Sequence, residues 1–291
     1  MPSFAPTEIP QALLHGYLVS AVGPRPICFA STIDENGKPN LAPFSFFNVF
    51  SSHPPVAVFS PAISGRTGTS KDTHNNVKKV PEVVINVVSY AMVQQTSVAS
   101  GEYPKEVNEF EKAGLTPIPS VKIKPFRVKE SPVQMECKVL EVKELGKGGG
   151  AGNLIICEII MLHINEDILN ADKKIEPHKI DLVGRMGGNW YCRANGDALF
   201  ELRQPGPNIG IGVDALPEAI RKSHVLTGNN LGQLASLTHL PEIEKIVAFK
   251  TSAEFLTIKN LAAEELHKAA KKMLDNNQIE EAMTLLIAVG K

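Results

Sequence analysis

Two polar side chains interrupt the most aromatic stretch of the chain, LAPFSFFN at residues 41–48. Ser45 and Asn48 lie there among phenylalanines, directly after the turn-like segment DENGKPN. An unpaired buried polar group costs about 1–3 kcal/mol, so a hydroxyl and a carboxamide are not expected inside an apolar cluster unless something uses them. The two residues therefore mark a candidate ligand-binding surface.

A second set of polar residues recurs at the ends of the next predicted elements. Ser60 and Arg66 follow the strand expected at residues 55–60, and Lys71, Asp72, Thr73 and Asn76 lie at the start of a helix. A helix is predicted over residues 71–82, with Asp72 or Thr73 as its N-cap. The N-terminus of a helix favours anions, and Arg66, Lys71 and the Thr73 hydroxyl lie near it in sequence. An ordinary capped helix with solvated charges would show the same short pattern, so this motif alone does not decide between the two interpretations.

Short β-strands are the elements that must position these residues. We expect strands at residues 27–33, 42–50, 55–60, 83–89, 133–142 and 153–164, a spacing typical of a barrel or sandwich. Asn36-Gly37 predicts a hairpin turn between the first two strands. A one-residue change of phase at Val139 and Leu140 predicts a β-bulge. The glycine-rich residues 146–153 lack the residues of a phosphate-binding loop, which favours a hairpin tip.

Helices are expected at residues 71–82, at residues 90–100 and throughout the part of the chain after Gln204. Near the end, Leu266, Ala269, Ala270 and Met273 follow the i, i+3, i+4, i+7 spacing of one apolar stripe. We therefore predict one domain over residues 1–205 and a helical extension over residues 206–291. The extension is expected to dock on the barrel or on a neighbouring subunit.

The composition excludes several classes of partner and site. Thirty basic and 31 acidic residues give a formal net charge of -1, which argues against a nucleic-acid or membrane-surface partner. The apolar N-terminal segment has no basic residue before it, so neither a secretory signal nor a membrane span is predicted, and the expected location is cytoplasmic. The four cysteines are far apart and are expected to be reduced thiols. His163 is expected to be a hydrogen-bonded interior or rim residue, and no metal site is predicted.

Five motifs occur in a fixed order between about Pro24 and Arg193. They are GPRP, STIDENGKPNLAPFSFFN, HPPV, KDTHNN and RMGGNWY, the last at residues 185–191. In this combination the chain resembles the flavin reductase-like family, the FMN-binding split barrels that include flavoredoxin. The resemblance implies a mainly β fold with some α, an antiparallel split β-barrel of Greek-key type that pairs as a homodimer. FMN would lie in a groove near the dimer interface.

The resemblance also implies roles for the two polar sets. It places the isoalloxazine ring beside Pro43, Phe44, Ser45, Phe46 and Asn48, and the ribityl phosphate among Ser60, Arg66, Lys71, Asp72, Thr73 and Asn76. Ser45 and Asn48 would then bind the polar edge of the ring. The cofactor itself would carry out hydride or electron transfer, so no catalytic side chain is predicted.

Arg185 marks a departure from the family pattern. Many short reductases of this class have, near this place, a histidine that has been linked to nicotinamide binding. We expect Arg185 either to contact a flavin or nicotinamide phosphate or to form a salt bridge at the subunit interface. The missing histidine argues against NAD(P)H as a co-substrate but not against FMN.

Three functions follow from these observations. The first is an FMN oxidoreductase that moves electrons from NAD(P)H to free flavin, a partner oxygenase or another acceptor. The second is a flavoredoxin-like electron carrier without direct NAD(P)H activity, which the missing histidine favours relative to the first. The third is a split barrel that binds a small ligand without redox chemistry. The intact run from LAPFSFFN to KDTHNN argues against this third function.

Overall fold

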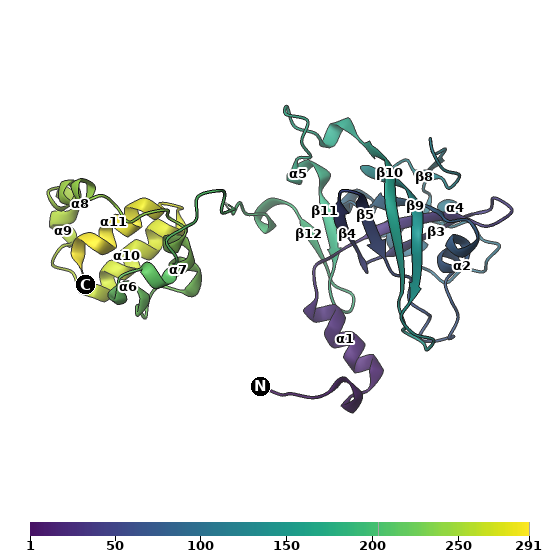
Figure 1. Ribbon diagram of the computed structural model, residues 1–291, viewed down its shortest axis with the longest axis horizontal. Helices are drawn as coiled ribbons and strands as arrows, with labels where there is room; N and C mark the ends of the chain where they lie inside the picture. Colours follow the sequence, from purple (N-terminus) through teal and green to yellow (C-terminus); the bar gives the residue numbers. More distant parts are fainter. Residues whose placement is uncertain (203, 291) are drawn as a thin grey trace. The chain divides into compact units, whose positions relative to one another are not determined.

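A computed structural model describes residues 1–202 and 204–290 of the protein. Its main element is a seven-stranded sheet in the order β3-β2-β6-β9-β10-β5-β4, in which every neighbouring pair is antiparallel (Figure 1). The strands are β2 (Cys28–Ile33), β3 (Pro39–Phe44), β4 (Phe47–Ser52), β5 (Pro55–Phe59), β6 (Glu82–Val87), β9 (Val133–Glu144) and β10 (Asn153–Ile164). The predicted antiparallel β architecture is confirmed.

Apolar side chains cover both faces of this sheet. On β2, Cys28 and Ala30 belong to one buried cluster, whereas Phe29 belongs to another. Successive residues of a strand point to opposite faces, so the two clusters lie on opposite sides of the strand. The central strand β6 is buried in the same way, with Val83, Val84 and Ile85 fully inaccessible. This agrees with the prediction that the run at residues 83–89 belongs to the middle of the sheet.

The single strand predicted over residues 42–50 is wrong, because the chain forms two strands there. β3 ends at Phe44 and β4 begins at Phe47, and these strands occupy opposite ends of the sheet order. Since consecutive Cα atoms are about 3.8 Å apart, Phe44 and Phe47 lie at most about 11 Å apart. Ser45 and Phe46 therefore bring the first and last strands of the sheet together, as closure of a barrel requires.

The β9–β10 hairpin contains the predicted bulge. Ile156 pairs with Glu141 and Cys157 pairs with Val139, which leaves Leu140 as an extra residue in β9. The bulge lets Val139 and Val142 pack against the same apolar cluster although they are three residues apart. The glycine-rich segment forms the hairpin loop, as predicted, between β9 and β10.

Shorter elements surround the sheet in the first part of the chain. The helices are α1 (Gln11–Ala21), α2 (Asp72–Lys79), α3 (Val93–Ala99), α4 (Glu109–Ala113) and α5 (Pro177–Ile180). A three-stranded sheet consists of β1 (Arg25–Pro26), β11 (Leu182–Arg185) and β12 (Tyr191–Ala194), and β7 (Pro117–Ile118) pairs with β8 (Arg127–Val128). The predicted helix over 71–82 is confirmed in part as α2, and that over 90–100 as a 3-10 turn (Tyr90–Met92) followed by α3.

The predicted N-cap of α2 is wrong by one or two residues. Lys71 is the N-cap, and its side chain makes no capping hydrogen bond. The Thr73 hydroxyl instead accepts a hydrogen bond from Asn40 Nδ2 at 3.0 Å. A tertiary contact with β3 thus engages the oxygen that the local sequence pattern assigned to capping.

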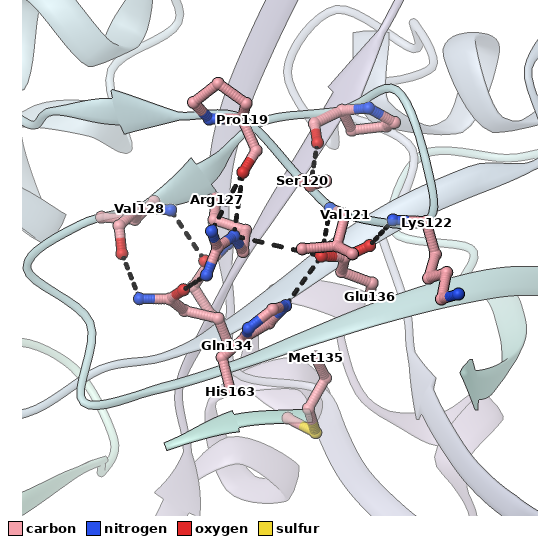
Figure 2. A network of polar contacts seen from close by, with 12 residues as sticks. Pro119, Ser120, Val121, Lys122, Arg127, Val128, Gln134, Met135, Glu136 and His163 are labelled. Atoms are coloured by element: carbon pink, nitrogen blue, oxygen red, sulfur yellow. Dashed lines mark hydrogen bonds and ion pairs between the residues drawn. The ribbon is translucent and has the colours of Figure 1, made fainter. Parts of the chain in front are cut away.

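A buried carboxylate connects the loop before β8 to the sheet. Figure 2 shows the fully buried Glu136 of β9 accepting hydrogen bonds from the backbone N–H groups of Val121 and Lys122, at 2.7 and 2.6 Å, and lying 2.7 Å from Nε2 of His163. Burial tends to raise the pKa of Glu136, but the hydrogen bonds outweigh it and the pKa is lowered. His163 is therefore the hydrogen-bonded rim residue that was predicted.

The chain divides into two compact units, Met1–Phe200 and Glu201–Lys291. The second unit is helical: α6 (Glu218–Arg221), α7 (Gly228–Ala235), α8 (Ile243–Lys250), α9 (Ala253–Ile258), α10 (Ala263–Asp275) and α11 (Ile279–Val289). Leu266 and Ala270 of the predicted stripe are buried in its core, and Ala269 and Met273 pack against it. The docking of this unit stays a prediction.

The cysteines, the metal-ligating residue types and the helix lengths can be compared with the sequence predictions over the described residues. All four cysteines are free thiols, and three of them are buried. Within residues 1–202 and 204–290, no group of His, Cys, Asp and Glu side chains is arranged to hold a metal ion. Over the same residues, no helix combines the length and the apolar character needed to cross a membrane.

Candidate functional site

A cavity of about 360 Å³ lies beside β3, between the loop that precedes α2 and the segment that follows α3. Its volume is within the range typical of small-molecule sites. Six of the twelve predicted site residues line it: Pro43, Phe44, Arg66, Lys71, Asp72 and Thr73. The structure therefore brings together part of the predicted ring site and most of the predicted phosphate site.

Buried and part-buried hydrogen bonds hold α2 against the wall of this cavity. Asn40 of β3 donates to the hydroxyls of Thr32 and Thr73, at 3.2 and 3.0 Å. Asn76 donates to Thr32 from the next turn of α2, at 3.1 Å. The first N–H groups of a helix have no acceptor within the helix, so the N-terminus of α2 adds donors to the cavity rim, where Asp72 lies.

Two cations of the cavity share one carboxylate. Arg66 and Lys71 both form ion pairs with Glu102, and the distance from Lys71 Nζ to Glu102 Oε1 is 3.0 Å. Hydrogen bonds from Arg66 and then from Lys71 lower the pKa of the Glu102 carboxyl to about 2. Sequence reasoning missed Glu102, because it lies more than 30 residues beyond its partners and belongs to no motif.

A second acidic residue of the cavity was also missed. Glu109, at the start of α4, accepts a hydrogen bond from the backbone N–H of Leu41 at 3.1 Å. Burial raises the pKa of Glu109 above its ordinary value. The lining hydroxyls of Thr67, Thr69 and Ser70 could have been found in sequence, because they form a hydroxyl-rich run between Arg66 and Lys71.

The other six predicted residues lie outside the lining of this cavity. They are Ser45, Phe46, Asn48, Ser60, Asn76 and Arg185. Ser60 is buried, and its hydroxyl accepts a hydrogen bond from the backbone N–H of Asn153 at 3.0 Å. Asn76 is buried as well, and its contact with Thr32 joins α2 to β2. In this chain Asn76 supports the helix whose N-terminus lies at the cavity rim, whereas Ser60 joins the end of β5 to the start of β10.

The residues near the β3–β4 connection are more accessible. Asn48 is exposed, and its Oδ1 accepts a hydrogen bond from the N–H of Val49 at 2.8 Å. Ser45 is half-buried and Phe46 is exposed. Phe46 still supports the fold, since its carbonyl accepts a hydrogen bond from the N–H of Ser60 at 2.9 Å.

Arg185 is engaged within its own hairpin. Its guanidinium donates to the hydroxyl of Tyr191 and, at 2.8 Å, to the carbonyl of Gly188. It also lies 4.7 Å from the centre of the Tyr191 ring, within the range of a cation–π contact. The arrangement orders the turn between β11 and β12.

Comparisons with known proteins show the family of the chain. The sequence model of the flavin reductase like domain family matches residues 22–177. An uncharacterized protein of Aquifex aeolicus is 37% identical over 190 residues, which cover 65% of this chain and 94% of that protein. An uncharacterized protein of Halalkalibacterium halodurans is 37% identical over 192 residues, which cover 65% of this chain and 89% of that protein.

Solved structures have the same fold over the first part of the chain. Component B of nitrilotriacetate monooxygenase from Bacillus cereus is 28% identical with a TM-score of 0.64, covering 69% of this chain and 98% of that chain. A split-barrel protein of Shewanella frigidimarina, described as a suspected flavin reductase, is 25% identical with a TM-score of 0.58. The match covers 68% of this chain and 95% of that chain. These similarities confirm the predicted split-barrel fold.

Proposed function

Because the chain belongs to the flavin reductase-like domain family, we propose that it binds FMN and transfers electrons from NAD(P)H through FMN to an acceptor. The family supports a flavin-related oxidoreductase, and the cavity beside β3 is the observation that supports FMN in particular. Arg66, Lys71 and the N-terminus of α2 offer donors for one phosphate group, next to a wall that contains Pro43 and Phe44.

The residues present fit a flavin mononucleotide. Charge-assisted hydrogen bonds from a guanidinium and an ammonium group are the contacts that a phosphate favours in proteins. Pro43 and Phe44 provide apolar surface for a flat ring, and the bound flavin would supply the redox chemistry itself. The contribution of the chain is to bind the nucleotide, orient its ring and exclude water from one side of it.

We further propose a homodimer in which the ring lies at the subunit interface. Ser45, Phe46 and Asn48, the predicted ring contacts, lie outside the cavity of a single chain. Close to them on the edge strand β4, the large apolar side chains of Val49 and Phe50 are exposed. Exposed apolar groups on an edge strand are typical of protein interfaces, so a second copy would cover these groups and complete the ring site.

An anaerobic visible spectrum of the protein with FMN, recorded before and after addition of NADH and then NADPH, tests the function. Binding shifts the flavin bands, and rapid loss of those bands with either nucleotide supports the reductase. If bound FMN keeps its colour with both nucleotides, direct NAD(P)H use is wrong. If no FMN binds at micromolar protein, the proposed site is wrong.

A second candidate function is an electron carrier that another protein reduces. The observation that favours it is Arg185, whose guanidinium is engaged with Tyr191 and Gly188 and so is not free for a nicotinamide nucleotide. A partner oxygenase is a candidate acceptor in either case, because the Bacillus cereus relative is a component of a monooxygenase.

A further inference from the structure

The carboxylate of Glu102 occupies the donors of the candidate phosphate site. It contacts both Arg66 and Lys71, and all three residues line the same cavity. A carboxylate and a phosphate accept the same charge-assisted hydrogen bonds from these donors. A phosphate that takes the donors now bound to Glu102 therefore competes with this carboxylate.

The charge of the cavity makes this competition important. Arg66 and Lys71 are its only cationic lining residues among those described, and the lining also contains Asp72, Glu102 and Glu109. A phosphate monoester would add further negative charge to a lining in which carboxylates already outnumber cations. Of the three carboxylates, Glu102 is the one that contacts both cations, so its position has the largest effect on phosphate binding.

The structure also allows the Glu102 carboxylate to move away from Arg66 and Lys71. It lies outside regular secondary structure, between α3 and α4, and 39% of its side chain is exposed. Water can therefore hydrate the carboxylate as soon as it moves away. Exposed ion pairs contribute little to stability, so an incoming phosphate can displace this one at small cost.

We propose that Glu102 is an internal counter-ion that a flavin phosphate displaces, and that it thereby sets the selectivity of the site between phosphorylated and phosphate-free flavins. This inference rests on the proposed FMN function. In the ligand-free protein Glu102 keeps Arg66 and Lys71 together at the cavity. Riboflavin, which has no phosphate, leaves these ion pairs in place and is insensitive to the charge of Glu102.

Titration calorimetry of the full chain with FMN and with riboflavin tests the proposal. Glu102→Gln removes the charge and keeps the shape, so it should tighten FMN binding about three- to fivefold and change riboflavin binding less than about twofold. Glu102→Ala should act in the same direction. Glu106→Gln is the matched control, since Glu106 is an exposed acid of the same loop that does not line the cavity, and it should change neither affinity.

The outcomes separate this inference from the function on which it rests. If Glu102→Gln leaves FMN affinity unchanged or weakens it, or tightens both ligands equally, Glu102 is not a displaced counter-ion although the flavin site stands. If neither the wild-type protein nor any variant binds FMN or riboflavin, the flavin site itself is wrong, and the inference is overturned with it.

Discussion

Replacing Lys71 with methionine should weaken FMN binding without a matching effect on riboflavin. The substitution keeps an unbranched apolar side chain in place of the lysine stem and removes the ammonium group. A charge-assisted hydrogen bond is worth about 1.5–3 kcal/mol, and the exposed position of Lys71 puts the expected loss near the lower end, at about 1–2 kcal/mol. That loss corresponds to a dissociation constant about 5–30 times larger.

The assay is calorimetric titration of both ligands into wild-type protein, Lys71→Met and Lys79→Met. Lys79 is a suitable control because it belongs to the same helix, forms an exposed ion pair with Glu35 and lies outside the cavity. Equal weakening of FMN and riboflavin, or no change for FMN, would refute the phosphate role of Lys71. In a double-mutant cycle, the effect of Glu102→Gln should be smaller in the Lys71→Met background, since the two side chains are in contact.

Three further predictions concern stability and assembly. Glu136→Ala should lower the free energy of unfolding by about 2–4 kcal/mol, because the N–H groups of Val121 and Lys122 lose their acceptor; an unchanged urea midpoint would contradict this. The pKa of Glu136 is lowered in the folded state, so its ionised form stabilises the protein above the ordinary glutamate pKa of 4.5, and that contribution is lost as the pH falls through the lowered value. The free energy of unfolding of Glu136→Gln should therefore depend less on pH below about 4.5 than that of the wild-type protein. The same pH dependence in both proteins would exclude a role of this carboxyl. Phe50→Glu should convert the proposed dimer to monomers in light-scattering chromatography and leave the far-UV circular dichroism spectrum nearly unchanged, because 69% of Phe50 is exposed in one chain. A dimer that survives would mean that another surface forms the interface.

Features that depend on near neighbours could be predicted from the sequence. The change of apolar phase at Val139 and Leu140 predicted the bulge at its observed position, because the period of a strand is a local property. The same holds for the strand at residues 153–164 and for the predicted helix at residues 90–100. The ordered motifs likewise indicated the family that the comparisons confirm.

Residues 42–50 show that a local sequence pattern does not predict which strands pair. Its apolar run is compatible with one strand, yet the chain crosses at Ser45 and Phe46 from one end of the sheet order to the other. Which strands pair depends on contacts between distant segments, such as Phe47 with Phe59, and these have no signature within nine residues. The polar interruption was visible in the sequence, but its structural meaning was not.

The sequence by itself determined the family, the antiparallel β character and the presence of cationic and hydroxyl groups in the segment before α2. Only the tertiary structure decided which of those groups share a cavity and which support the fold: Lys71 lines the cavity, whereas Ser60 and Asn76 form hydrogen bonds within the fold. Only the structure brought Glu102 to Arg66 and Lys71. The physical reason is that strand period and helix capping act over a few residues, whereas the charge of a site is the sum over side chains that folding gathers from separate parts of the chain.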